Sequence, residues 1–340
     1  MLQKQNRIPS PQEFLAKFPL PSALKDLKEK RDGEIRSVLS GESKKLLAVV
    51  GPCSAHAHAP VLEYMIRLGH LQEKLGEKLI IVPRIYTNKP RTKGVGYQGM
   101  FLQPDSNGAA DIARGIESVR RLYIAVMEET GLTGADEMLY PENTAYVEDL
   151  VSYFAVGARS VENPLHRQVA SGLDVPVGMK NPMSGSLSSL IDSVFAAQSA
   201  QSFKLGEYQV RSDGNPYAHA ILRGGVDANG SFAPNYGLEE VARIEMLYKD
   251  GGLCNPAAIV DCNHSNSGKQ YLRQISIARE VMRLRNSYEG YKQIVKGLMI
   301  ESFLEEGNQP SDEIFGKSIT DPCIGWSDTE KLLCEIADLL

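Results

Sequence analysis

Residues 45–84 read KLLAVVGPCSAHAHAPVLEYMIRLGHLQEKLGEKLIIVPR, two short apolar runs separated by a helical pattern. The same alternation recurs to the end of the chain and predicts eight strands, at residues 46–50, 79–84, 136–139, 155–159, 177–180, 218–223, 257–261 and 295–300. Most of these runs are continuous and apolar, which is typical of strands buried on both faces. Eight strands alternating with amphipathic helices indicate an α/β fold, a (β/α)8 TIM barrel.

The first part of the chain does not follow this alternation. Ser10 and Glu13 form a predicted capping box, and a charged helical segment at 23–40 stops at Gly41. We therefore expect residues 1–44 to form an N-terminal helical arm with a role in oligomer contacts or regulation.

Two later segments also stand out from the alternation. The connection at 88–107 is long, polar and Gly-rich, and long loops in compact domains are usually functional. The alternating pattern at 202–217 predicts a β-hairpin inserted before the sixth strand. The catalytic barrel is placed at 45–340, and its last helix is expected to begin with a capping box formed by Ser327 and Glu330.

Composition and charge exclude several classes of protein. Of the 340 residues, 42% are apolar and 23% are charged, and the formal net charge is -5. This charge argues against a nucleic-acid-binding or anionic membrane surface. The chain lacks an apolar run long enough for a membrane span, and its N-terminus lacks a signal-peptide pattern. Five widely spaced cysteines do not suit a disulfide framework, so we expect a cytoplasmic protein with reduced thiols.

Every predicted strand delivers an ionisable group at its C-terminal end, where such barrels carry their active sites. Cations form one set: Arg84, Lys89, Arg91, Arg159, Lys180 and Arg223. Gathered around one opening, they would repel each other unless an anion were bound. Because arginine matches phosphate and carboxylate groups, the sequence predicts a substrate with several anionic groups.

The second set contains Cys53, His264, Glu301 and Asp321, whose donors suit Mn, Fe, Zn or Co better than Mg or Ca. Their spacing matches no local metal motif, so only the barrel brings them together.

Other cysteine and histidine residues leave alternatives open. Cys262 is either a redox partner of Cys53 or, the favoured interpretation, part of the core. His56 and His58 fit a metal motif with Cys53, although a solvated loop is the favoured interpretation. His166 is a catalytic candidate, with an orienting role equally plausible.

Several motifs together resemble type I 3-deoxy-D-arabino-heptulosonate 7-phosphate (DAHP) synthase over nearly the whole chain. They are Gly51-Pro52-Cys53-Ser54, Lys89-Pro90-Arg91-Thr92, Gly157-Ala158-Arg159, Ala170-Ser171-Gly172-Leu173, Leu222-Arg223-Gly224-Gly225, Asn263-His264-Ser265-Asn266 and Gly316-Lys317-Ser318-Ile319-Thr320-Asp321. The resemblance implies condensation of phosphoenolpyruvate with D-erythrose 4-phosphate, with release of phosphate, as the first step of the shikimate pathway.

The resemblance also implies roles for individual residues. Phosphoenolpyruvate would contact Arg84, Gly157, Ala158, Arg159, Lys180 and Arg223, and the sugar phosphate would contact Lys89, Pro90, Arg91 and Thr92. A divalent Mn²⁺, Fe²⁺, Zn²⁺ or Co²⁺ ion would be held by Cys53, His264, Glu301 and Asp321. Lys89, Glu137 and His166 are the candidates for proton transfer or for steering water.

The chain departs from the best-known pattern of the family at Tyr97-Gln98, Asn163-Pro164 and Asp261-Cys262. None of these departures replaces an implied ligand. In the family that the chain resembles, an N-terminal arm and a hairpin before the sixth strand shape a pocket for an aromatic amino acid. Because this chain has both features, the resemblance implies feedback inhibition in a homodimer or homotetramer, and the effector is left open. Two alternatives are a 3-deoxy-D-manno-octulosonate 8-phosphate synthase-type reaction and a non-catalytic amino-acid-sensing barrel.

Overall fold

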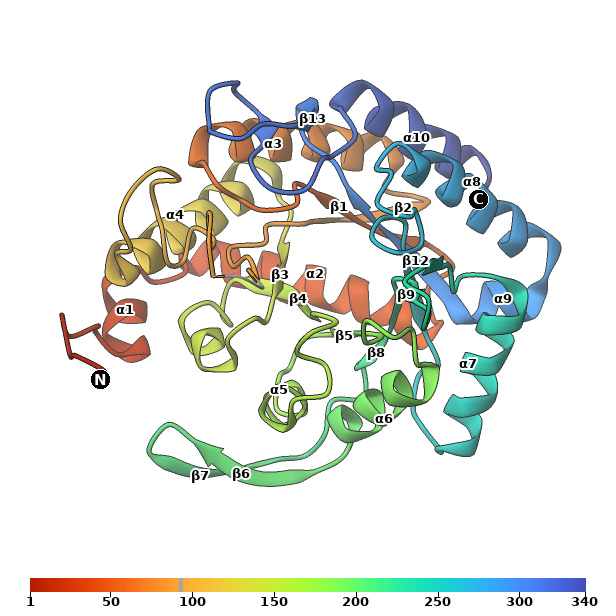
Figure 1. Cartoon of the computed structure of the whole chain (residues 1–340), viewed down its shortest axis with the longest axis horizontal. Helices are drawn as coiled ribbons and strands as arrows, with labels where there is room; N and C mark the ends of the chain where they lie inside the picture. Colours follow the sequence, from red (N-terminus) through yellow and green to blue (C-terminus); the bar gives the residue numbers. More distant parts are fainter. Residues whose placement is uncertain (92–93) are drawn as a thin grey trace.

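The computed structural model describes residues 1–91 and 94–340, so the predicted substrate contact Thr92 lies outside the described residues. Eight parallel strands form one sheet in the order β2-β1-β12-β11-β8-β5-β4-β3 (Figure 1). Their bounds are Leu46–Gly51 (β1), Leu79–Pro83 (β2), Gly134–Glu137 (β3), Val151–Val156 (β4), Val177–Lys180 (β5), His219–Leu222 (β8), Ala258–Asp261 (β11) and Val295–Glu301 (β12). A bridge between Arg84 and Ala135 joins the two edge strands, which confirms the predicted TIM barrel.

Helices alternate with these strands and cover the outside of the barrel (Figure 1). Their bounds are His58–Leu75 (α3), Ile112–Thr130 (α4), Pro164–Ala170 (α5), Leu187–Gln198 (α6), Leu238–Asp250 (α7), Arg273–Ser287 (α8), Glu289–Ile294 (α9) and Trp326–Asp338 (α10), with a 3-10 turn at Pro141–Tyr146 (η1). Among the residues described, no helix combines the length and hydropathy that a membrane crossing requires.

The N-terminal arm contains α1 (Pro11–Lys17) and α2 (Ser22–Ser40). The capping box at Ser10 is present, and Gly41 ends α2 in the left-handed conformation, as the sequence predicts. Ile35, Val38 and Leu39 of α2 pack with side chains from inside the barrel. Because α2 covers the N-terminal end of the barrel, the opposite end, where the strands terminate, is left for ligands.

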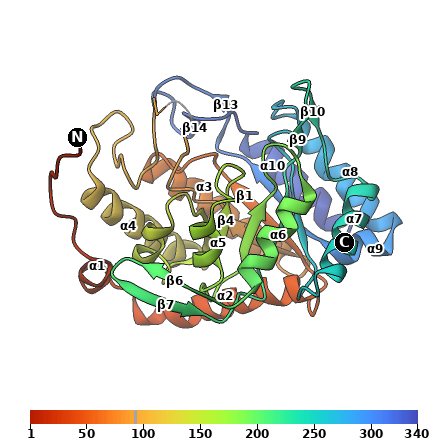
Figure 2. The same ribbon diagram turned by 60° about the horizontal axis from the view of Figure 1, so that its bottom comes forward.

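The predicted hairpin is formed by β6 (Gln201–Leu205) and β7 (Tyr208–Ser212), which pair antiparallel. Figures 1 and 2 show it projecting from the barrel wall beyond α5 and α6. Two further small sheets pair β9 (Gly225–Val226) with β10 (Phe232–Ala233) and β13 (Glu305–Asn308) with β14 (Lys317–Ser318).

Several predicted boundaries are wrong. The third strand begins two residues earlier than expected, at Gly134, where a Cβ would lie 2.8 Å from the Tyr123 ring. The fourth strand begins four residues earlier, at Val151, and includes Tyr153, whose buried hydroxyl lies 2.8 Å from His219 Nε2. Glycine is a poor strand residue, but close packing against Tyr123 favours it at position 134, whereas the missed start of the fourth strand contains the strand-favouring residues Val151 and Tyr153.

The last helix also begins earlier than predicted. Gly325 is its N-cap, and Ser327 lies within the first turn instead of capping it. Trp326 starts the helix because its ring packs edge-on against Tyr64, at 5.6 Å between ring centroids.

Candidate active site

A cavity of about 350 Å³ lies at the C-terminal ends of the barrel strands. Twelve predicted site residues line it: Arg84, Lys89, Pro90, Arg91, Glu137, Gly157, Ala158, Arg159, Lys180, Arg223, His264 and Asp321. Lys269 lines the cavity as well, and sequence reasoning missed it because it lies in a loop, beyond any predicted strand end. The strand ends therefore gather the predicted cations at one opening.

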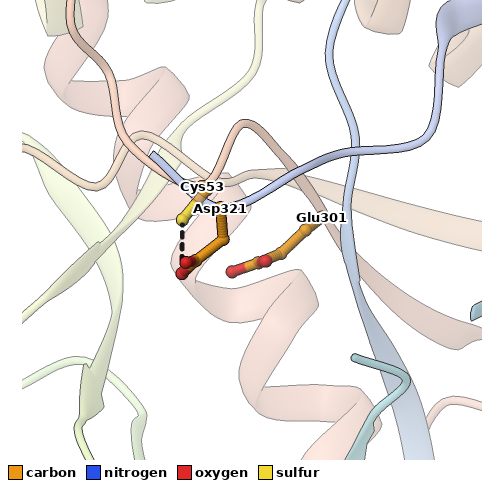
Figure 3. A group of neighbouring side chains, drawn as sticks. All are labelled: Cys53, Glu301 and Asp321. Carbon is orange, nitrogen blue, oxygen red and sulfur yellow. Dashed lines mark hydrogen bonds between the residues drawn. The ribbon is translucent and has the colours of Figure 1, made fainter. Parts of the chain in front are cut away.

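Three of the four predicted metal ligands form a compact cluster beside this cavity. Ligand atoms of Cys53, Glu301 and Asp321 all lie within 4.8 Å of one another (Figure 3). Cys53 Sγ donates to Asp321 Oδ2 at 3.3 Å. His264 lies at the edge of the cluster, with its Nε2 4.0 Å from Glu301 Oε1. A thiol, an imidazole and two carboxylates suit a transition-metal ion, so the residues present fit the implied group.

Lys89 joins the metal-ligand candidates to the cation-lined cavity. Its ammonium lies 2.7 Å from Cys53 Sγ and 2.8 Å from Asp321 Oδ2. Burial alone would raise the pKa of Asp321, but the ammonium holds it well below its ordinary value. Burial raises the pKa of the Cys53 thiol to about 12, with the Glu301 carboxylate adding to the rise. The free thiol is therefore protonated at neutral pH.

Glu301 is held in place by two donors from different strand ends. Arg84 Nη1 donates to its Oε1 at 2.7 Å, and Asn263 Nδ2 donates to its Oε2 at 2.6 Å. Burial opposes ionisation, but Arg84 keeps the pKa of Glu301 below its ordinary value. Glu301 is therefore an anionic side chain whose orientation is fixed. Asn263 had been noted only as part of a motif.

Asp261 was noted only as a departure from the family pattern, yet it organises the far side of the site. Its Oδ2 lies 3.1 Å from Lys180 Nζ and 2.9 Å from His264 Nδ1. Burial would raise its pKa, but His264 and Lys180 hold the pKa well below its usual range. The carboxylate thus orients both Lys180, a predicted substrate contact, and His264, a predicted metal ligand. Its position at the end of a buried strand was the signal that could have found it.

The three candidates for proton transfer are placed differently. Lys89 and Glu137 line the cavity, and a Cβ on Gly157 would come within 2.2 Å of Glu137 Oε1. His166 is buried on α5 and does not line the cavity; its Nε2 lies 3.0 Å from the Leu139 carbonyl oxygen. The structure does not bring His166 to the reacting groups.

The open alternatives for cysteine and histidine are now distinguished. Cys262 is a free, fully buried thiol in the hydrophobic core. The solvated-loop interpretation is wrong for His56, which is 1% exposed with its Nε2 3.3 Å from Asp312 Oδ1. His56 packs edge-on against Phe303, which removes it from solvent. His58 is exposed at the start of α3.

Comparisons with known proteins identify the family of this chain. The sequence profile of the DAHP synthetase I family matches residues 22–334. The chain is 39% identical over 338 residues to the Trp-sensitive phospho-2-dehydro-3-deoxyheptonate aldolase of Enterobacter agglomerans, which covers 97% of this chain and 94% of that protein. It is 38% identical over 337 residues to the Tyr-sensitive enzyme of Salmonella typhimurium, covering 96% and 91% of the two chains.

A solved structure with the same fold is that of the phospho-2-dehydro-3-deoxyheptonate aldolase from Francisella tularensis SCHU S4. It matches with a TM-score of 0.92 and 30% sequence identity, covering 100% of this chain and 98% of that one. The chain therefore belongs to the DAHP synthetase I family, and it is a transferase of the 3-deoxy-7-phosphoheptulonate synthase type.

Proposed function

We propose that this chain condenses phosphoenolpyruvate with D-erythrose 4-phosphate and water to give DAHP and inorganic phosphate. One observation carries the proposal: six predicted cations line a single cavity beside a thiol–carboxylate cluster. Arg84, Lys180 and Arg223 are buried and suit the carboxylate and phosphate of phosphoenolpyruvate. Lys89 and Arg91, on the β2–α4 loop, suit the sugar phosphate.

Cys53, His264, Glu301 and Asp321 would hold a divalent Mn²⁺, Fe²⁺, Zn²⁺ or Co²⁺ ion. When bound, this ion would supply Lewis-acid polarisation of the aldehyde carbonyl and would favour the thiolate of Cys53. Asp261 would keep His264 oriented toward the cluster, and Arg84 would keep Glu301 ionised.

The chain's own residues then account for charge and proton movement. Carbon three of the enol attacks the aldehyde carbon, water adds to carbon two, and phosphate leaves with its oxygen. Lys89 would donate a proton to the alkoxide formed from the aldehyde oxygen, and Glu137 would orient the attacking water. The two protons that this water loses would go back to Lys89 and to the departing phosphate. His166 is assigned a supporting role, because it lies behind the cavity against Leu139.

Phosphate release on mixing both substrates with Mn²⁺ tests this function, with a chelator as the control. Cys53→Ala should abolish Mn²⁺-dependent turnover. Cys262→Ala, which removes an equally buried thiol from the core, should retain it. Replacing erythrose 4-phosphate with arabinose 5-phosphate tests the eight-carbon alternative. Absence of phosphate release with erythrose 4-phosphate, or faster release with arabinose 5-phosphate, would contradict the proposal.

We also propose feedback inhibition by an aromatic amino acid at a second cavity of about 780 Å³. It lies between the N-terminal arm and the segment that follows the hairpin, at 214–217. Apolar side chains such as Leu20 and Tyr217 would contact the ring of the amino acid, Arg36 would bind its carboxylate, and Asp32 would bind its ammonium.

The two relatives described above are named for different effectors, so the inhibitor has to be found by experiment. Phenylalanine, tyrosine and tryptophan should be compared in inhibition and thermal-shift assays. The predicted homodimer or homotetramer is tested by light scattering. If none of the three amino acids stabilises the protein in the thermal-shift assay, regulation at this cavity is contradicted.

A further inference from the structure

The seam between β2 and β3 is closed partly by a side chain instead of by backbone. Ile85 N donates to the Ala135 carbonyl at 2.8 Å. In a parallel ladder the next donor, Thr87 N, would pair with the Glu137 carbonyl two residues further along. Instead, Thr87 N donates to Asp136 Oδ1 at 2.8 Å, and Leu139 N takes the Glu137 carbonyl. The Asp136 carboxylate thus replaces a backbone acceptor where the barrel closes.

Three donors converge on this carboxylate. Besides Thr87 N, the Thr87 hydroxyl donates to Oδ2 at 2.6 Å, and Glu137 N donates to Oδ1 at 2.7 Å. Asp136 is 2% exposed and Thr87 is fully buried. Charge-assisted hydrogen bonds of this kind are about twice as strong as neutral ones. Thr87 is therefore fixed to the end of β3 at both its backbone and its side chain.

Thr87 also lies where the first part of the β2–α4 loop contacts the part that returns toward α4. Phe101 N donates to the Thr87 carbonyl at 3.1 Å, and Lys89 N donates to the Gln98 carbonyl at 2.9 Å. A Cβ on Gly99 would lie 2.3 Å from the Thr87 carbonyl oxygen, so the two parts of the loop are in close contact. Lys89 and Arg91 follow Thr87 by two and four residues, so the position of Thr87 determines where the segment that carries these two cations starts.

The burial of the Asp136 carboxylate is energetically unfavourable, and a contact with a purely structural role would not need a charged group there. Among the residues that the structure describes, no cationic side chain forms an ion pair with Asp136. Burial raises its pKa to about 7; the Thr87 and Glu137 donors lower it, and the Glu137 carboxylate raises it again. A buried carboxylate without a cation destabilises the folded state. Such unfavourable groups are concentrated at functional sites.

We propose that Asp136 is a positioning residue that holds the sugar-phosphate-binding loop through Thr87. This inference rests on the proposed binding of D-erythrose 4-phosphate by Lys89 and Arg91. Loss of the Asp136 carboxylate should therefore weaken the binding of the sugar phosphate. The binding of phosphoenolpyruvate, which mainly involves other strand ends, should be unchanged.

The clamp is complete only when Asp136 is ionised. Three elements face the carboxylate: the β2–α4 loop with Thr87, β3 with Glu137, and α4 with Tyr123. Burial keeps Tyr123 neutral by raising its pKa, so among the groups described on these three elements Glu137 is the charged neighbour that acts on Asp136. A proton on Oδ2 would point at the Thr87 hydroxyl, which also receives Asn88 Nδ2 at 3.3 Å. The Thr87 hydroxyl would then lose its acceptor.

The test compares Asp136→Asn and Thr87→Val with Thr133→Val, a buried threonine just before β3, as the matched control. At pH 8, the first two should raise the KM for erythrose 4-phosphate about tenfold, the loss expected for a charged hydrogen bond. The KM for phosphoenolpyruvate should change less than twofold. The double variant should be no worse than Thr87→Val, because the two residues act as one unit.

The pH profile supplies a readout that a structural role would not change. The KM for erythrose 4-phosphate should rise in the wild type, relative to Asp136→Asn, as the pH falls from 8 to 6. Dividing the KM of the wild type by the KM of Asp136→Asn at each pH cancels the effect of titrating the substrate phosphate, which is the same for both proteins. Equal changes in both KM values, or a wild-type profile in Asp136→Asn, would overturn the proposal. Calorimetric binding of erythrose 4-phosphate gives the same comparison without turnover, so an inactive wild type would refute only the proposed reaction.

Discussion

Gly157 should control the position of Glu137 without contributing much to stability. Its position directly after β4 leaves Glu137 Oε1 only 2.2 Å from where a Cβ would stand. Ordinary contact needs about 3.4 Å, so Gly157→Ala must displace the carboxylate oxygen by roughly 1 Å. The displaced atom is at the end of a flexible, half-buried side chain, so it can rotate away. The free energy of unfolding should therefore fall by less than about 1 kcal/mol.

Turnover should respond far more strongly than stability. A 1 Å misplacement of a reacting group costs on the order of 100-fold in rate. We expect Gly157→Ala to lower kcat by about that factor while its melting temperature stays close to that of the wild type. Glu137→Gln should show a similar loss, because it removes the same carboxylate from the same place.

Steady-state phosphate release and thermal melting measure the two effects separately. Gly172→Ala is the matched control, because a Cβ there would meet Ser212 Cβ at an ordinary 3.5 Å. It should leave both measurements unchanged. A Gly157→Ala enzyme that turns over within about threefold of the wild type would refute the assignment of Glu137 to the chemistry.

Three further outcomes are expected. Arg120→Met should destabilise the protein by about 3 kcal/mol and expose the arm to proteolysis, because the buried Arg120 pairs with Asp149 and donates to the Phe18 carbonyl of the arm. Mn²⁺ should raise the melting temperature of the wild type but not of Cys53→Ala; an equal rise in both would place the ion elsewhere. Burial raises the pKa of Asp136 in the folded state to about 7, above its ordinary value of 3.8, so between these pH values the folded state binds a proton that the unfolded state has lost. The free energy of unfolding should therefore fall as the pH rises from about 4 to 7. The fall amounts to as much as about 4 kcal/mol and should be missing in Asp136→Asn when the two denaturation profiles are compared.

The sequence by itself determined the architecture and most of the cavity. Continuous apolar strands alternating with helical patterns predict a parallel sheet buried on both faces, and the count of eight strands favours a closed barrel. Once a barrel is expected, strand ends such as Arg84 and Glu301 must share one rim. Local capping was equally readable at Ser10 and Gly41, because those interactions involve neighbours in the chain.

Tertiary structure alone decided which polar groups are buried and what they contact. Asp261 and Asp136 occupy similar places at the ends of β11 and β3, yet the pKa of the first is lowered by His264 and Lys180, whereas that of the second is raised by burial. Nothing within either strand distinguishes them: Asp261 is paired with His264, in the loop after its strand, and with Lys180, 81 residues away, whereas among the described residues no cation pairs with Asp136. The electrostatic free energy of a buried carboxylate depends on its surroundings in three dimensions, which only the folded chain provides.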